Sequence, residues 1–99
     1  MNIIILQPAQ VEIIEAFEYY EYSIKGLGFQ FLNEINHSVE MIKDFPGLWS
    51  KLSPKSKIRK CVIKKFPYAM YYSSDVYTIK IIAVAHFNRK PLYWKERIS

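Results

Sequence analysis

The sequence predicts an α+β fold, a two-layer sandwich in which a helical hairpin covers an antiparallel sheet in the order β-α-α-β-β-β. Three observations lead to this prediction. An apolar run opens the chain, two segments with helical periodicity follow it, and residues 59–89 are rich in β-branched and aromatic residues. The 99 residues are enough for one hydrophobic core and too few for two, so we expect residues 1–99 to form a single domain.

The first half of the chain predicts a strand and two helices. Residues 2–7 are typical of an interior strand covered on both sides, because apolar residues do not alternate with polar ones. Pro8 suits the first turn of a helix, and residues 25–28, Lys-Gly-Leu-Gly, supply its end and a tight reversal. A second helix is expected over residues 29–43, antiparallel to the first.

Helical spacing assigns residues to the two faces of each helix. The inner stripe of the first helix is predicted as Ile13, Ala16, Phe17, Tyr20 and Ile24, with Glu12, Glu15, Glu18 and Glu21 on the solvent side. The inner stripe of the second is predicted as Phe29, Leu32, Ile35, Val39 and Ile42.

The second half predicts a loop and a three-stranded meander. Residues 48–58 lack a clean period and are read as an exposed loop. The meander covers residues 59–89 and is interrupted at Pro67 and at the turn of residues 73–75. In its last strand the two-residue period places Ile79, Ile81 and Ala83 on one face, and Lys80, Ile82, Val84 and His86 on the other. The tail after Arg89 has room for a turn or two of helix, and one sheet face, or one end of it, is expected to stay available.

Charge divides the chain into an acidic and a basic half. Residues 1–50 hold two Lys or Arg against seven acids, and residues 51–99 hold twelve against two. A basic half attracts nucleic acid or an acidic protein surface. The candidate nucleic-acid-binding residues are Lys51, Lys55, Lys57, Lys64, Lys65 and Lys80. A merely solvated basic face is the alternative interpretation.

His86 and Arg89 lie at the end of the last predicted strand, where both can project from the rim of the sheet. If the strands pair in order, Arg59, Lys64, Lys65, Arg89 and Tyr93 could converge on the imidazole. Such a group suits RNA cleavage without a metal, because histidine can act as acid or base and arginine grips phosphate. Arg59, His86, Arg89 and Tyr93 are therefore the candidate catalytic residues.

Other chemistries find no pattern in the sequence. His37 and His86 are isolated and the basic half has no paired carboxylates, so we expect no metal and no cofactor. Cys61, the single cysteine, is read as a buried apolar residue, which excludes an intrachain disulfide and fits a reducing cytosol. The opening apolar run is too short for a signal peptide or a membrane span, so a cytoplasmic protein without membrane contact is expected.

Several short motifs in succession resemble the RelE/ParE superfamily of bacterial toxins. They are Glu15-Ala16-Phe17-Glu18-Tyr19-Tyr20-Glu21, Gly26-Leu27-Gly28 with Phe31 and Glu34, Phe66-Pro67-Tyr68 with Tyr71, and Ala83-Val84-Ala85-His86 with Arg89, Pro91 and Trp94. The resemblance covers nearly the whole chain. It implies a toxin of a type II toxin-antitoxin system, also described as a plasmid stabilisation protein, that forms an oligomer with a cognate antitoxin.

Two activities follow from the resemblance, and one of them is enzymatic. Whether this chain is an enzyme is therefore left open. RelE-like members cleave mRNA on the ribosome as mRNA interferases, and by position Arg59 matches the sheet arginine that meets phosphate, while His86, Arg89 and Tyr93 fall where activity residues cluster. ParE-like members inhibit DNA gyrase and are not nucleases; the long hairpin and the H-x-x-R-x-P ending are similar to that branch. Ribosome-dependent mRNA cleavage is the leading hypothesis, gyrase inhibition the alternative, and a non-toxic RNA-binding module a third.

Overall fold

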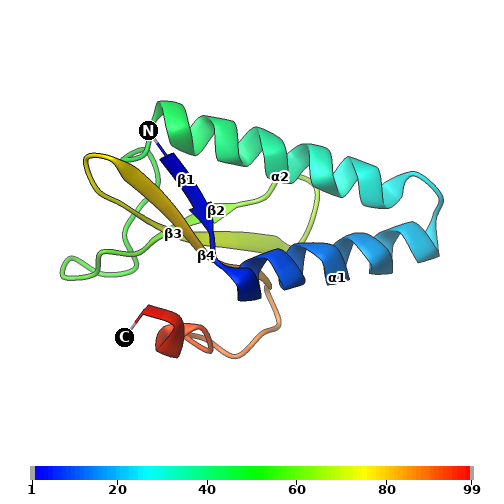
Figure 1. Cartoon of the computed structure of the whole chain (residues 1–99). Helices are drawn as coiled ribbons and strands as arrows, with labels where there is room; N and C mark the ends of the chain where they lie inside the picture. Colours follow the sequence, from blue (N-terminus) through cyan, green and yellow to red (C-terminus); the bar gives the residue numbers. More distant parts are fainter. Residues whose placement is uncertain (1, 99) are drawn as a thin grey trace.

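Two helices pack on one face of a four-stranded sheet in the computed structural model, which describes residues 2–98 (Figure 1). The elements are β1 (Asn2–Ile5), α1 (Gln7–Ser23), α2 (Leu27–Asp44), β2 (Arg59–Val62), β3 (Tyr68–Ser74), β4 (Thr78–His86) and the short 3-10 helix η1 (Lys95–Ile98). The sheet order is β1-β4-β3-β2. The predicted two-layer α+β fold is confirmed. The meander is antiparallel, and β1 joins it parallel to β4, so the complete sheet is mixed.

The helical hairpin turns where the sequence predicts. Pro8 lies in the first turn of α1, and Gly26 has the left-handed φ of 92° that ends a helix. The Glu21 carboxylate accepts hydrogen bonds from the backbone N–H groups of Gly26 at 2.9 Å and Gly28 at 3.0 Å. Glu21 was predicted to face solvent, and this prediction is wrong because its carboxylate closes the hairpin. Gly28 is buried against α1, and its lack of a side chain is what allows the two helices to approach.

An aromatic cluster fills the layer between the hairpin and the sheet. Tyr20 and Phe31 from the helices meet Phe66 and Tyr68, with ring centroids 4.9–5.5 Å apart in most pairs. The predicted inner stripes need two corrections. Ile24 and Phe29 are mostly exposed, because Ile24 lies beyond the end of α1 and the buried stripe of α2 contains Phe31 instead. Buried on α2 are Gly28, Phe31, Ile35, Ser38 and Ile42.

The first strand does not have the interior position that its apolar run predicts. β1 lies at an edge of the sheet and pairs with β4 only. Its residues alternate between exposed and partly buried, and Ile4 is 47% exposed. The run is apolar on both sides although one side faces solvent, which is why the pattern suggested a covered strand.

A β-bulge in β4 changes the predicted faces of the last strand. Tyr71 pairs with Ala83 and Tyr72 with Ile81, so Ile82 has no partner across the ladder. Beyond the bulge the alternation shifts by one residue. Val84 therefore joins Ile81 in the core under the helices, whereas Ile82 and Ala83 belong to a second cluster on the opposite side.

The C-terminal tail covers part of the face that was expected to stay available. Trp94 is buried and packs with Ile58, Ile82 and Ala83. The short helix η1 follows, as the length of the tail predicted, and Figure 1 shows this segment on the side of the sheet away from α2. Residues 45–58 form no helix or strand beyond one isolated bridge, so the predicted loop is confirmed.

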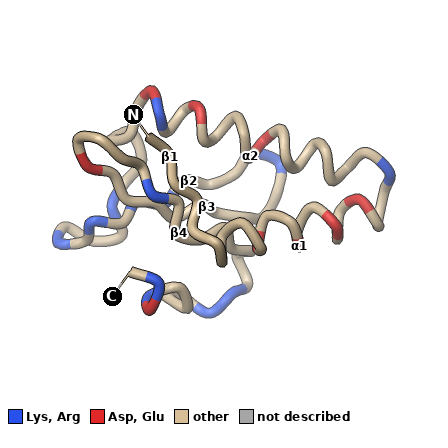
Figure 2. The backbone as a smooth tube through the Cα atoms, viewed as in Figure 1, with Lys and Arg blue, Asp and Glu red and all other residues tan. Residues whose placement is uncertain are grey.

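The acidic and basic halves of the sequence become two regions of the molecule. Acidic residues line the two helices, while Lys and Arg gather on the 48–58 loop, the strands and the tail (Figure 2). Cys61 is buried as predicted, and burial raises the pKa of its thiol. Within residues 2–98, no helix combines the length and apolar character that crossing a membrane requires.

Replacing Gly28 tests the close approach of the two helices. A Cβ at this position would lie 2.6 Å from the Phe17 carbonyl oxygen, so Gly28→Ala is expected to destabilise the fold by about 1–3 kcal/mol. Gly47→Ala is the matched control, because a Cβ there meets nothing within 4 Å. Urea unfolding measures both, and equal midpoints for the two variants would contradict the packing described.

Candidate functional site

Of the four predicted catalytic residues, Arg89 and Tyr93 lie with His86 at one end of the sheet, and Arg59 lies toward the other end. Arg59 at the start of β2 is opposite Tyr72, which pairs with Ile81, whereas His86 at the end of β4 pairs with Tyr68. Five residues of β4 therefore separate the two positions, roughly 16 Å along the strand. The expectation that Arg59 joins the imidazole is wrong, because the antiparallel register brings the last residue of β2, Val62, toward that end and leaves Arg59 at the far end of the strand.

Arg59 belongs to a groove at its own end of the sheet, which we call the basic groove. Its volume is about 520 Å³. Its lining consists of Lys51, Lys57, Arg59, Ser73, Ser74, Asp75, Thr78 and Lys80. The Arg59 guanidinium donates to the carbonyl of Trp49 at 2.5 Å, which ties the 48–58 loop to β2. Three of the predicted nucleic-acid-binding lysines thus share this groove, and Lys55 is exposed on the same loop.

The other two predicted lysines lie elsewhere. Lys64 and Lys65 are in the turn between β2 and β3 and border a shallow hollow with His37 of α2. Lys65 forms an ion pair with Glu34 at 3.8 Å. They are therefore remote from the basic groove and beside the acidic helices.

His86 stands at the rim of the sheet between two hollows. One, of about 240 Å³, lies toward the tail and also contains Lys60, Arg89 and Tyr93; we call it the histidine hollow. The other, of about 300 Å³, lies toward α1. The imidazole packs edge-on against Tyr68 at 5.2 Å, and its Nδ1 accepts a hydrogen bond from the Asn88 N–H at 3.0 Å. In the neutral ring this leaves the proton on Nε2.

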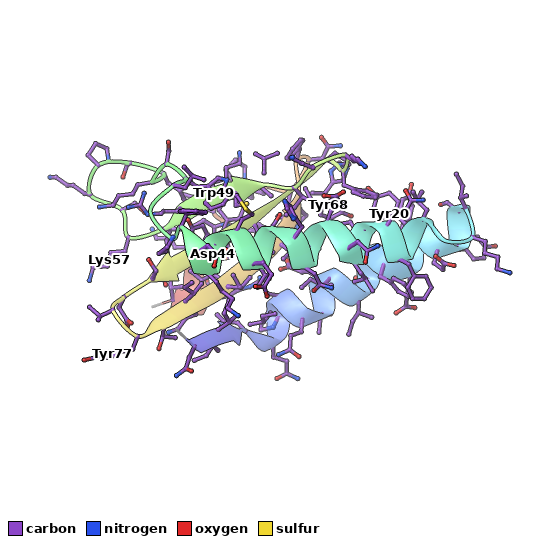
Figure 3. The ribbon with its side chains drawn as sticks, turned by 90° about the horizontal axis from the view of Figure 1, so that it is seen from above. Tyr20, Asp44, Trp49, Lys57, Tyr68 and Tyr77 are labelled. Atoms are coloured by element: carbon purple, nitrogen blue, oxygen red, sulfur yellow. The ribbon has the colours of Figure 1, made fainter. Side chains whose placement is uncertain are left out.

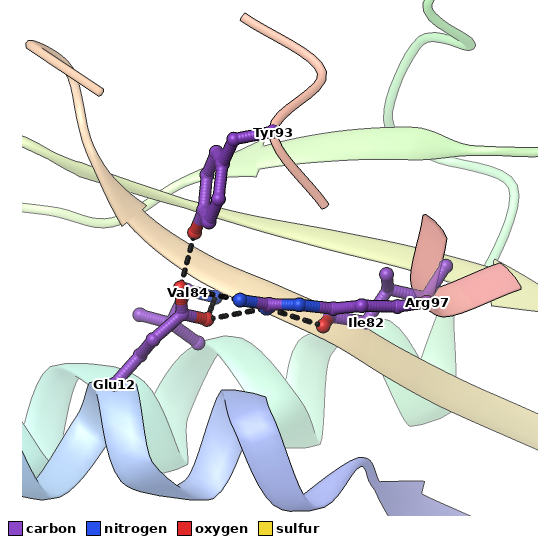
Figure 4. A network of polar contacts seen from close by, with 5 residues as sticks. All are labelled: Glu12, Ile82, Val84, Tyr93 and Arg97. Atoms are coloured by element: carbon purple, nitrogen blue, oxygen red, sulfur yellow. Dashed lines mark hydrogen bonds and ion pairs between the residues drawn. The ribbon is translucent and has the colours of Figure 1, made fainter. Parts of the chain in front are cut away.

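Tyr93 and Arg97 are fixed by a carboxylate that the sequence did not single out (Figure 4). Glu12 of α1 accepts hydrogen bonds from the Tyr93 hydroxyl, from both terminal nitrogens of Arg97 at 2.8 and 3.1 Å, and from the Val84 N–H at 3.0 Å. Arg97 also donates to the Ile82 carbonyl at 3.1 Å. We call these contacts the Glu12 network, and they connect the tail to both α1 and β4.

The Glu12 network restricts what Tyr93 can do chemically. Burial, together with the hydrogen bond to Glu12, raises the pKa of the Tyr93 phenol. Its proton is directed at Glu12, so the hydroxyl is not presented to a substrate. Arg89 stacks on the Tyr93 ring with its guanidinium carbon 3.9 Å from the ring centroid, while remaining exposed. Tyr93 therefore positions Arg89 beside His86.

Sequence reasoning placed Glu12 on the solvent side because four glutamates recur every three residues on α1. The structure corrects this: the Glu12 side chain is 13% exposed. One sequence feature could have indicated that Glu12 is buried. It lies three residues after Ala9 and four before Ala16, so it shares a helical face with these two small residues, which are both buried. Its partners are 72 to 85 residues distant in the chain, so no local pattern could identify them.

Metal binding finds no candidate in the described part of the chain. Among residues 2–98, no three His, Cys, Asp or Glu side chains gather closely enough to hold an ion. The basic groove and the histidine hollow together provide cationic side chains, the imidazole of His86 and hydroxyl groups.

No protein-family model matches this chain, and no curated protein matches it. Among solved structures, the fold is similar to a chain in the structure of the chromosomal ParDE TA system from P. aeruginosa, with a TM-score of 0.63. The match covers 87% of this chain and 95% of that chain at 14% sequence identity. At this identity the similarity establishes the fold, which is the one that the sequence motifs implied.

The Glu12 network is tested by Glu12→Gln. The amide loses the charge that Arg97 requires and brings N–H groups where only acceptors fit, so we expect a loss of about 2–3 kcal/mol in unfolding free energy. This is less than the roughly 3–5 kcal/mol for breaking a fully buried pair, because the two side chains keep 13% and 20% exposure. Glu18→Gln, at an exposed position on the same helix, should change stability by less than about 0.5 kcal/mol. Equal effects in urea unfolding would contradict the network.

Tyr72 makes the stability of the fold depend on pH in the alkaline range. Its hydroxyl donates to the Pro46 carbonyl at 2.7 Å, and burial raises the pKa of the phenol from 10.0 to about 12. The folded state holds this proton more tightly than the unfolded chain, so the contribution is complete below pH 10 and is lost between pH 10 and 12. Unfolding free energies should fall across that window less steeply in Tyr72→Phe than in wild type. Parallel pH profiles would count against this role.

Proposed function

We propose that this chain is the toxin of a type II toxin-antitoxin system, a cytoplasmic protein that a cognate antitoxin holds inactive. The fold similarity to a ParDE TA system structure over 87% of the chain supports this proposal, together with the succession of RelE/ParE-like motifs in the sequence. The antitoxin is expected to be acidic in its toxin-binding segment, because the surface outside the helices is basic.

The toxin acts on DNA gyrase, without cutting RNA. The observation that carries this choice is that Arg59 and His86 do not meet. Arg59 lies level with Ile81 of β4, five positions before His86. Metal-free RNA cleavage needs a base, an acid and cations around one phosphate. Here the Tyr93 hydroxyl is bonded to Glu12, and Arg59 lies at the other end of the sheet from His86.

Ribosome-dependent mRNA cleavage is the second candidate, and one specific observation favours it. The histidine hollow combines an imidazole with three cations, Lys60, Arg89 and Lys90. His86 could transfer a proton there while Arg89 holds a phosphate. Tyr71 also lines this hollow and could be a second proton-transferring group, but Arg59 lies outside it and the Tyr93 hydroxyl is bonded to Glu12. For these two reasons mRNA cleavage ranks below gyrase inhibition.

Two assays on the purified protein separate the candidates. Gyrase supercoiling should be inhibited, while mRNA incubated with translating ribosomes and the protein should stay intact. Codon-specific cuts that drop at least about 100-fold in His86→Ala would establish the nuclease instead. Glu18→Gln serves as the control for substitution at an unrelated exposed site.

Expression in cells tests the toxin assignment itself. Without an antitoxin, induction should arrest growth, and coexpression of the cognate antitoxin should restore it. Normal growth with a well-folded, soluble protein would contradict the toxin proposal and favour a non-toxic RNA-binding module.

A further inference from the structure

A further hollow lies on the outer face of the sheet, between the 48–58 loop and the C-terminal tail, and we call it the apolar hollow. Its volume is about 470 Å³, which is within the range of small-molecule sites. The buried side chains of Ile58 and Trp94 form its floor. Tyr71 of β3 packs against Trp94 there, with ring centroids 5.1 Å apart. The function proposed above assigns no role to this hollow.

Exposed apolar side chains surround the floor. Leu52 of the loop is 39% exposed, Leu92 of the tail 53% and Ile98 of η1 44%. Apolar groups that border one hollow while still in contact with water are stabilised when a ligand covers them. These three side chains therefore form an unfilled apolar rim.

Leu92 is also held in an unfavourable backbone conformation. Its φ is 61°, and within residues 2–98 only Lys65 is a second non-glycine residue with a positive φ. A bulky side chain is rarely found in this left-handed region, and backbone strain of this kind is concentrated at binding sites and active sites. The strained residue of the tail is thus one that lines the apolar hollow.

Contacts on both sides hold the walls of the hollow in place. On the tail side, the Arg97 guanidinium is bonded to Glu12, which fixes η1. On the loop side, the Leu52 N–H donates to the Ile58 carbonyl at 3.0 Å. Figure 3 shows this loop, on which Lys57 lies, extending past Asp44 at the end of α2, so the helices do not cover it. The hollow is therefore preformed and open to solvent.

The charge around the apolar hollow is positive. Lys60 of β2 and Lys95 of η1 both line it and are both exposed, and among the described residues of its lining none is acidic. Within residues 2–98, neither lysine forms an ion pair. Charge complementarity therefore favours a ligand that carries an anionic group on an apolar body.

The backbone around the hollow favours a compact ligand over an extended peptide. A peptide that adds to a sheet needs unpaired N–H and C=O groups along a strand edge. Here the 48–58 loop already occupies the edge of β2, where the Lys60 N–H donates to the Ser50 carbonyl at 3.2 Å. In the tail, the N–H groups of Lys95 and Arg97 donate to carbonyls of the tail itself. What remains available is apolar surface and two ammonium groups.

We propose that the apolar hollow binds a small apolar carboxylate of the medium-chain fatty acid type. The hydrocarbon chain lies over Trp94, between Leu52 and Leu92, and the carboxylate meets Lys60 and Lys95. This inference does not depend on the chain being a toxin.

A ¹H–¹⁵N NMR titration of the full chain with decanoate tests the proposal. Amide signals of the tail and of the 48–58 loop should shift together. Affinity should increase about fourfold for each methylene group from hexanoate to decanoate, because each one adds buried apolar surface. Decylammonium should bind at least about tenfold more weakly than decanoate, because its charge is repelled by the two lysines.

Leu92→Gly separates ligand binding from folding. Glycine accepts a φ of 61° without strain, so the urea midpoint of this variant should not fall. Its affinity for decanoate should nevertheless fall about tenfold, because the apolar contact with the chain is lost.

Matched lysine variants test the anionic end of the ligand. Lys60→Gln with Lys95→Gln should weaken decanoate binding about fivefold. Lys25→Gln with Lys64→Gln removes the same charge at exposed positions away from the hollow and should change the affinity less than about twofold.

Three results would overturn the proposal. One is the absence of amide shifts up to about 1 mM decanoate. Another is shifts at the exposed Tyr22 and Phe29 of the hairpin as large as those in the hollow, which would indicate general adsorption to apolar surface. The third is an affinity for decanoate that neither Leu92→Gly nor the Lys60 and Lys95 pair of substitutions lowers.

Discussion

The carboxylate of Glu12 is the contact on which the arrangement of the C-terminal half depends. It is an acid of the helical layer that is shared by the tail, through Tyr93 and Arg97, and by β4, through the Val84 N–H. A partly buried carboxylate is stable only if cations and donors surround it, and these contacts supply them. Because the tail is fixed there, Trp94 covers the outer sheet face and Arg89 stacks beside His86.

The separation of charge gives the two ends of the sheet different capabilities. At one end, His86 and Arg89 border a small hollow beside the tail. At the other, the loop, β2 and β4 form a groove whose side chains are cationic or hydroxyl-bearing. A single surface joining both sets would be suited to cutting a polynucleotide. Two surfaces at opposite ends are instead suited to holding separate partners.

Local patterns predicted the helices and strands of this fold well, but they predicted poorly which of these elements lie side by side. The meander, the hairpin turn at Gly26 and the helix start at Pro8 follow from residue types within a few positions, and all are confirmed. The edge position of β1 and the bulge at Ile82 depend on which strands pair, and that choice is made between residues more than 70 positions apart or by a one-residue shift in register.

The candidate site shows the same division. The types of residue that matter, cations and one histidine, were evident from composition. Their distribution was not, because two-residue alternation indicates a face of a strand and says nothing about which end of the sheet it occupies. Glu12 was misassigned for a related reason: helical periodicity was read from the other glutamates, while the groups that draw this carboxylate inward come from the final residues of the chain.

Parallel pairing of β1 with β4 makes the first residues of the chain neighbours of some of the last. During synthesis, β1 leaves the ribosome long before the strand beside which it will lie, and the helices above the sheet are finished before most of the sheet exists. The nascent polypeptide must carry an apolar segment without its partner until β4 has also left the ribosome. A ribosome that stops early therefore releases a fragment with an unpaired sheet edge, prone to aggregation and unable to act as the finished protein does.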